Sequence, residues 1–146
     1  MKKILIINGP NLNLLGNRED DIYGKDSLDK IKSDCEKKGI EKRLEIIFFQ
    51  SNNEGEIIDK IHEVNDKFDG LIINPAAFTH SSIAILDSLR AINKPKIEIH
   101  ISNIYSREEY RKKSITSEGV DGLICGFGSL SYILAIEALS NLIYNK

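Results

Sequence analysis

Five short apolar runs alternate along this chain with longer segments of helical period, and this alternation constrains the fold more than any other feature. The runs are rich in isoleucine, leucine or phenylalanine, and they cover residues 4–8, 44–50, 70–74, 97–102 and 122–126. Apolar runs of this length, bounded by polar residues or glycine, predict strands that are buried on both faces. Such strands are typical of a parallel sheet covered by helices.

The intervening segments place apolar residues three or four positions apart, which predicts amphipathic helices at residues 27–38, 54–67, 81–92 and 129–144. Ser106-Arg107-Glu108-Glu109 has the pattern of a capping box and predicts a further short helix. The succession of strand–helix units predicts one domain over residues 1–146. Its expected architecture is a flavodoxin-like three-layer α/β sandwich with a five-stranded parallel sheet.

Composition and charge exclude several classes of protein. A hydrophobic fraction of 41% and a charged fraction of 29% are typical of a folded soluble domain, not of a disordered or fibrous chain. The net charge of −2 gives no electrostatic reason to expect nucleic acid as a partner. A local basic patch could still hold a small anion; it consists of Arg107, Arg111, Lys112 and Lys113.

The first apolar run stops at Asn8, which is too early for a signal peptide or a membrane span. We therefore expect a cytoplasmic protein with no membrane partner. Cys35 and Cys125 lie far apart and lack the paired spacing of zinc or redox sites, which predicts reduced thiols.

Residues 96–102 alternate strictly between apolar and polar side chains. The alternation places Glu98, His100 and Ser102 on one face of the predicted strand. Such a polar face belongs either to an exposed edge strand or to a strand that borders a cleft, where His and Glu need hydrogen-bond partners.

Polar residues at the ends of other strands favour a cleft, because the carboxyl ends of parallel strands meet at one edge of the sheet. Asn8 and Asn74 both end predicted strands. His80 and Asp87 are two helical turns apart, so both could project from one side of the helix at residues 81–92. Alternatively, His80 caps that helix and Asp87 is a solvated helical position.

Residues 9–26 form the longest irregular segment, and loops longer than about 12–15 residues are usually functional or disordered. This loop carries Arg18 and Tyr23. A guanidinium beside a tyrosine favours the phenolate, which could then act as a general base. Alternatively, Tyr23 anchors its loop beside a solvated arginine.

Separated motifs occur in a fixed order along nearly the whole chain: Gly9-Pro10-Asn11-Leu12-Asn13, Arg18-Glu19 with Ile22-Tyr23-Gly24, Gln50-Ser51-Asn52 with Glu54-Gly55-Glu56, Asn74-Pro75, Thr79-His80, Glu98-Ile99-His100-Ile101-Ser102-Asn103 and Cys125-Gly126-Phe127-Gly128. Together they resemble the type II 3-dehydroquinate dehydratases. The resemblance implies a trans-elimination of water from 3-dehydroquinate to 3-dehydroshikimate through an enolate, in the shikimate pathway or in quinate breakdown. It also implies no metal, Schiff base or organic cofactor, and assembly as a homododecamer, a tetramer of trimers.

The resemblance implies a role for each matching residue. Tyr23 would remove the proton alpha to the ketone, and Arg18 would support its phenolate. His100 would protonate the departing hydroxyl, tuned or oriented by Glu98, while Asn11 would help hold a water that stabilises the enolate. The implied substrate-binding residues are Asn74, Ile101 and Ser102 for the carboxylate, and His80, Asp87 and Arg111 for the ring hydroxyls.

Four positions depart from the common pattern of this family. They are Ala76 where glycine is frequent, Phe78 where tyrosine is frequent, Leu86 where arginine is frequent, and Tyr105 in place of histidine. None of them matches a catalytic position, so they bear on local packing after His80 and on subunit contacts.

Other functional classes fit the sequence less well. A flavodoxin-like nucleotide or flavin binder needs a phosphate-cradling loop after the first strand, where this chain has Asn-Leu-Asn-Leu-Leu. A receiver-type signalling module needs carboxylates where this chain has Asn8 and Asn74. A non-catalytic domain that binds a small molecule remains an alternative, although the joint presence of Arg18, Tyr23 and His100 argues against it.

Overall fold

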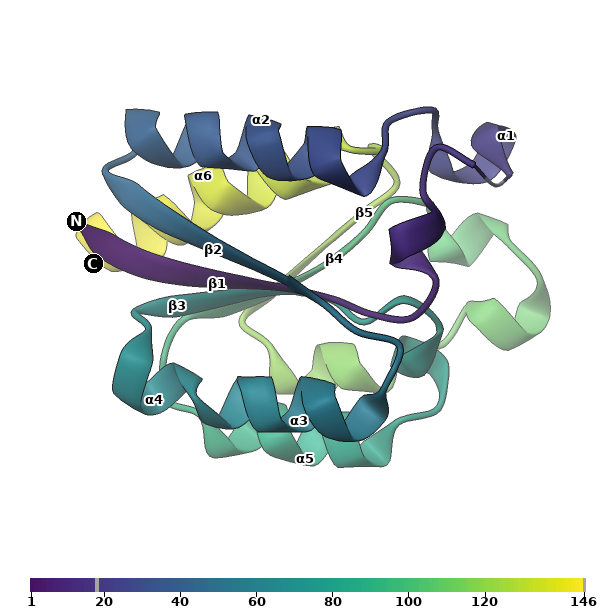
Figure 1. The fold of residues 1–146 in the computed structure, drawn as a ribbon. Coiled ribbons are helices and arrows are strands. Elements are labelled where there is room, and N and C mark those ends of the chain that lie inside the picture. Colours follow the sequence, from purple (N-terminus) through teal and green to yellow (C-terminus); the bar gives the residue numbers. More distant parts are fainter. Residues whose placement is uncertain (18, 146) are drawn as a thin grey trace.

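The computed structural model describes residues 1–17 and 19–145, which form a parallel five-stranded sheet between two layers of helices (Figure 1). The strands are β1 (Lys2–Asn8), β2 (Leu44–Gln50), β3 (Gly70–Asn74), β4 (Lys96–His100) and β5 (Gly122–Cys125). Their order across the sheet is β2-β1-β3-β4-β5, and each neighbouring pair is parallel. This is the flavodoxin-like order, so the predicted fold class is confirmed.

Helices α2 (Leu28–Glu41) and α6 (Leu130–Tyr144) cover one face of the sheet, and α3 (Glu54–His62), α4 (Val64–Lys67) and α5 (Ile83–Ala91) cover the other (Figure 1). The remaining helical turns are short. They are α1 (Asp20–Tyr23) and the 3-10 helices η1 (Leu12–Leu14), η2 (Ala76–His80), η3 (Ile104–Ser106), η4 (Glu109–Arg111) and η5 (Thr116–Gly119).

Strand β1 shows why the apolar runs are continuous. Ile4 and Ile6 contribute to the core beneath α2 and α6, whereas Leu5 and Ile7 contribute to the core beneath α3 and α5. All four side chains are fully buried. Because successive side chains of a strand point to opposite faces, a strand covered on both sides needs apolar residues at every position.

Serine side chains cap the first turns of α2 and α5. Ser27 accepts a hydrogen bond from the Lys30 N–H at the start of α2, and Ser82 accepts one from the Ile85 N–H at the start of α5. Each bond satisfies a backbone donor that the first helical turn would otherwise leave unpaired.

Two details of the sequence prediction are wrong, and one alternative is excluded. The capping-box pattern does not open an α-helix, because Ser106 ends the 3-10 turn η3 and Arg107 has an extended backbone. The helix predicted at residues 54–67 is divided between α3 and α4. The excluded alternative is an edge strand at residues 96–102, because β4 pairs with β3 on one side and with β5 on the other.

The strand register brings polar residues together at the carboxyl edge of the sheet. Asn8 of β1 lies beside Gln50 of β2 and Asn74 of β3. Behind them, the buried Tyr132 of α6 donates a hydrogen bond to Asn8 Oδ1 at 2.6 Å and accepts one from Asn74 Nδ2 at 3.1 Å. One phenol therefore links two strands to the helix that covers them.

The structure gives two further observations that bear on the sequence analysis. No helix in residues 1–17 and 19–145 is long and apolar enough to cross a membrane. Both cysteines are free, and burial raises the pKa of the Cys35 thiol to about 12.

Tyr132→Phe should lower the free energy of unfolding by about 1–3 kcal/mol, because Asn8 and Asn74 would lose a buried hydrogen-bond partner. Urea unfolding followed by circular dichroism measures this. The control is Tyr144→Phe, which removes a hydroxyl from an exposed hydrogen bond to the Arg43 carbonyl. Equal losses in the two variants would contradict the special importance of the buried link.

Candidate functional site

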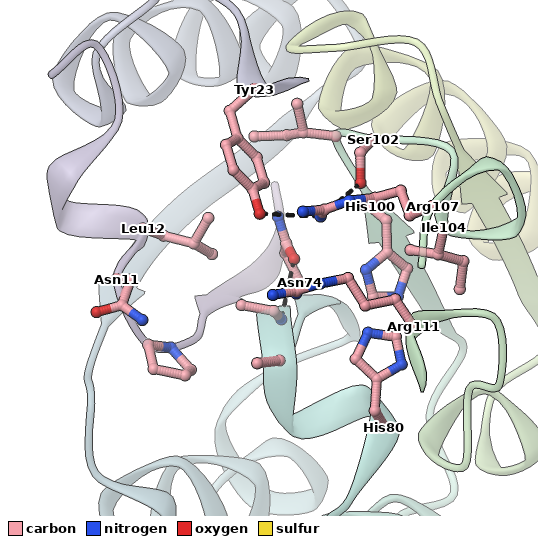
Figure 2. Close-up of a pocket in the computed structure, with 14 residues that line it drawn as sticks. Asn11, Leu12, Tyr23, Asn74, His80, His100, Ser102, Ile104, Arg107 and Arg111 are labelled. Atoms are coloured by element: carbon pink, nitrogen blue, oxygen red, sulfur yellow. Dashed lines mark hydrogen bonds between the residues drawn. The ribbon is translucent and has the colours of Figure 1, made fainter. Parts of the chain in front are cut away.

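A pocket opens at the carboxyl edge of the sheet, where the resemblance and the polar strand ends both predict a site (Figure 2). Its lining comes from the loop after β1, from α1, from the turn after β3 and from the segment after β4. The lining residues are Pro10, Asn11, Leu12, Tyr23, Asn74, Ala76, Ala77, His80, His100, Ile101, Ser102, Ile104, Arg107 and Arg111.

Most of the predicted site residues are therefore brought together. Glu98 does not line the pocket but lies behind His100, in hydrogen-bond contact with it. Asp87 is exposed on α5 and is not among the described lining residues. Arg18 lies outside the described residues.

The spacing argument that linked His80 to Asp87 is wrong. His80 ends the 3-10 helix η2, and α5 begins only at Ile83, so the two residues do not share one helix. The capping alternative for His80 is wrong too, because Ser82 caps α5.

The end of β2 holds the first loop in place. Asn52 Oδ1 accepts a hydrogen bond from the Asn11 N–H at 2.9 Å, and Gln50 Nε2 donates one to the Gly9 carbonyl at 3.1 Å. Asn11 has φ 69°, in the left-handed region that asparagine tolerates better than most residues. These contacts give the Gln50-Ser51-Asn52 motif a physical role, since it fixes the backbone that presents Asn11.

Among the described residues, Arg107 is a cation in direct contact with Tyr23. Its Nη1 donates a hydrogen bond to the Tyr23 hydroxyl at 2.9 Å, and its guanidinium lies 5.2 Å from the centre of the Tyr23 ring. Figure 2 shows the phenol of Tyr23 pointing toward this guanidinium. The arrangement stabilises negative charge on the phenolic oxygen.

His100 is paired with a fully buried carboxylate. Its Nε2 lies 2.6 Å from Glu98 Oε2, and the two residues are two positions apart on one face of β4, as the alternation predicted. Burial alone would raise the pKa of the Glu98 carboxyl, but the hydrogen bond and positive charge of His100, with hydrogen bonds from two threonines, lower it below its usual range. Glu98 is therefore charged at neutral pH, and Nε2 of His100 carries a hydrogen.

His80 presents its second ring nitrogen to the pocket in a neutral state. Its Nδ1 lies 2.8 Å from the Lys113 carbonyl, which can only accept, so Nδ1 carries the hydrogen. Burial lowers the pKa of His80, and the positive charges of His100 and the two nearby arginines lower it further, against the hydrogen bond to Lys113. In the neutral imidazole Nε2 is then a hydrogen-bond acceptor.

The turn after β3 has a defined geometry at Asn74 and Ala76. Asn74 Oδ1 accepts a hydrogen bond from the Ala76 N–H at 3.2 Å, while its Nδ2 bonds Tyr132, so the amide has one orientation. Ala76 has φ 52°, a backbone conformation that favours glycine. An alanine at this position therefore carries backbone strain that glycine would avoid.

Three site features were missed from the sequence alone. Arg107 was noted only as part of a basic patch, and Ser114 and Thr116, which both contact Glu98, carried no signal at all. Hydroxyl residues in a loop are too common for their spacing to predict a contact with a distant strand. Among the described residues, no group of His, Cys, Asp and Glu is arranged to hold a metal ion.

The ionised Glu98 makes stability depend on pH. Its pKa is lower in the folded chain than in the unfolded one, so its contribution is present above about pH 4.3 and is lost as the pH falls through the folded pKa. Glu98→Gln should lower the free energy of unfolding by about 1–3 kcal/mol at pH 7, and this difference should shrink toward pH 3.

Urea unfolding at several pH values from 7 to about 3 measures this difference. Glu45→Gln, at an exposed position of β2, is the matched control and should change little. A deficit in Glu98→Gln that is the same at every pH would show that ionisation of Glu98 is not linked to folding.

Comparison with known proteins gives consistent matches over the whole chain. A family model described as Dehydroquinase class II matches residues 2–140. A 3-dehydroquinate dehydratase of Clostridium botulinum (strain Okra / Type B1) is 56% identical over 147 residues, covering 100% of both chains. A 3-dehydroquinate dehydratase of Caldicellulosiruptor saccharolyticus is 56% identical, covering 98% of this chain and 99% of the relative.

Solved structures give the same match. The type II dehydroquinase from Butyrivibrio crossotus DSM 2876 has a TM-score of 0.92 and 46% identity, covering 94% of this chain and 97% of that chain. The type II dehydroquinase from Propionibacterium acnes has a TM-score of 0.94 and 41% identity, covering 97% of both.

Proposed function

The chain belongs to the class II dehydroquinase family, and we propose that the pocket at the carboxyl edge of its sheet is where water is removed from 3-dehydroquinate. The activity is that of a hydro-lyase, with 3-dehydroshikimate as product. The residue roles below are our proposal, and the geometry of the pocket supports them.

The charge of the lining is the observation that carries the proposal. Arg107 and Arg111 line the pocket together with two histidines, and the described lining includes no carboxylate. The substrate is a carboxylate that gains further negative charge when its enolate forms. A cationic lining favours both the bound anion and the more negative intermediate.

Tyr23 is proposed as the base that removes the proton alpha to the ketone. The Arg107 guanidinium, 2.9 Å from its hydroxyl, supports the phenolate form that a base requires. Arg18 shares this role in the sequence prediction, and that assignment stays a prediction. Asn11, held by Asn52, is proposed to bind the water that stabilises the enolate oxygen.

His100 is proposed as the acid for the second half of the reaction. Hydroxide is a poor leaving group, so the departing oxygen needs a proton as its bond to carbon breaks. Glu98 supports the charged imidazolium before transfer and does not itself contact the pocket. It is therefore a positioning residue for His100.

The remaining predicted residues are proposed to bind the substrate. Asn74 and the segment of Ile101 and Ser102 would hold the carboxylate, and His80 and Arg111 would contact the ring hydroxyls. Asp87 is exposed on α5, so it could reach a pocket only if another copy of the chain presented it. This is compatible with the predicted homododecamer, which stays a prediction, as does the cytoplasmic location.

Tyr23→Phe should reduce turnover by about 10²–10⁴-fold, because it removes the base but keeps the ring. The assay follows the ultraviolet absorbance of the conjugated enone of 3-dehydroshikimate, with EDTA-treated protein. Tyr105→Phe, at an exposed tyrosine outside the described pocket lining, is the control and should remain fully active. Near-normal turnover in Tyr23→Phe would overturn the assignment of the base.

A further inference from the structure

Three hydroxyl groups surround the buried carboxylate of Glu98, and the proposed reaction does not use them directly. Thr79 Oγ1 lies 2.8 Å and Ser114 Oγ 3.0 Å from Glu98 Oε2, while Thr116 Oγ1 lies 2.5 Å from Oε1. Thr79, Thr116 and Glu98 are fully buried, and Ser114 is 9% exposed. Both carboxylate oxygens are thus occupied by protein donors.

The hydrogen atoms of this cluster favour a charged Glu98. Thr79 Oγ1 also lies 2.6 Å from Ser114 Oγ and 2.7 Å from Thr116 Oγ1. Each hydroxyl has a single hydrogen, so three hydroxyl hydrogens are available for five short oxygen–oxygen contacts. An ionised carboxylate only accepts hydrogen bonds, so it can accept one from each of the three hydroxyls. A protonated carboxyl would add a donor, and one hydroxyl would then have to accept from it instead of donating to it.

The cluster is held together by the backbone. The Ile115 N–H donates to the Thr79 carbonyl at 2.7 Å, and His80 donates to the Lys113 carbonyl at 2.8 Å. Ser114 and Thr116 flank this attachment point. The turn that supplies Thr79 and the pocket residue His80 therefore also fixes the loop that supplies the other two hydroxyls.

We propose that Thr79, Ser114 and Thr116 are positioning residues for proton transfer by His100. They keep Glu98 a carboxylate, and the carboxylate keeps a hydrogen on His100 Nε2, so that Nδ1 is the nitrogen that delivers the proton. In that step the Nδ1–H bond breaks and an O–H bond forms on the leaving hydroxyl. The carbon–oxygen bond breaks and its electron pair goes to oxygen, while the electrons of the enolate restore the carbonyl and form the new carbon–carbon double bond. The products of the step are water, the enone and a neutral imidazole.

This inference rests on the proposed role of His100 as the acid. Other titratable and charged groups around the pair are Cys125 on β5, His80 on η2, and Arg107 and Arg111 on the pocket side. Burial, with a smaller effect of Glu98, raises the pKa of the Cys125 thiol to about 11, so it stays neutral. Substitutions at the three hydroxyl residues leave all of these groups in place.

The test compares Thr116→Val, which replaces the hydroxyl by a methyl group of similar shape, with Thr116→Ser, which keeps it. Thr116→Val should lower kcat about tenfold with little change in KM, because part of the contribution of the general acid is lost. The high-pH limb of its kcat profile should move to lower pH, since a less stable carboxylate holds the imidazolium less well. Thr116→Ser should restore both properties.

The control for loss of a buried hydroxyl is Ser88→Ala, whose Oγ donates to the Ile85 carbonyl within α5. It should leave kcat and the pH profile unchanged. Ser114→Ala serves as a second variant at the least buried of the three hydroxyls, and the same direction of change is expected. It decides the question if Thr116→Val does not fold.

A readout without substrate separates this inference from the proposed function. The nitrogen-15 NMR signals of the His100 ring report which nitrogen carries the hydrogen in the neutral imidazole. They should show hydrogen on Nε2 in the native protein and a mixture of the two tautomers in Thr116→Val or, if that variant does not fold, in Ser114→Ala. Unchanged ring signals together with an unchanged pH profile would overturn the positioning role. Full turnover in His100→Ala would instead overturn the proposed role of His100 as the acid, and this result does not depend on the ring signals of the hydroxyl variants.

Discussion

The buried charge of Glu98 is the constraint on which the arrangement of the site depends. A carboxylate with no exposed surface must have its oxygens paired, because an unpaired buried charge costs far more than a typical hydrogen bond contributes. The pairing partners come from three separate parts of the chain: β4 itself, the turn η2 and the loop that leads into η5. Satisfying one carboxylate therefore fixes the relative positions of segments that also supply His80 and His100.

The sheet edge provides the complementary constraint. Parallel strands of similar length bring their last residues, Asn8, Gln50 and Asn74, side by side. The Gln50 side chain holds the loop after β1 and the Asn74 side chain holds the turn after β3, while Asn8 Nδ2 donates to the Phe49 carbonyl of β2. Tyr132 connects this edge to α6 at the same point. Hydrogen bonds attach the loop after β1, which carries Asn11, to the end of β2.

The distribution of charge then decides the chemistry that such a pocket favours. The only carboxylate in contact with His100 is sequestered behind it, while arginines and histidines face the cavity among the described residues. Negative charge thus lies behind the proposed proton donor, and positive charge lies where the proposed site would hold an anionic substrate and its enolate. This separation of charge favours the binding of an anion and the stabilisation of further negative charge in the pocket.

Local patterns in the sequence were sufficient for the layers of the fold. Continuous apolar runs predicted strands covered on both faces, and strict alternation in residues 96–102 predicted that Glu98 and His100 share one face. The conformation of single turns was less predictable. Ser106 begins a capping-box pattern in the sequence but ends a 3-10 turn in the structure, since tertiary contacts override a weak local preference. The resemblance supplied the roles of most pocket residues, which periodicity could not.

The sequence by itself thus determined the strand–helix succession, the polar strand ends and the family, because these depend on local patterns of apolar residues and on ordered motifs. Only the tertiary structure decided that Arg107 contacts Tyr23, that β4 is internal, and that Thr79, Ser114 and Thr116 surround Glu98. The physical reason is that these contacts join residues far apart in the chain. Their distances are set by strand order and loop attachment, which leave no periodic trace in the sequence.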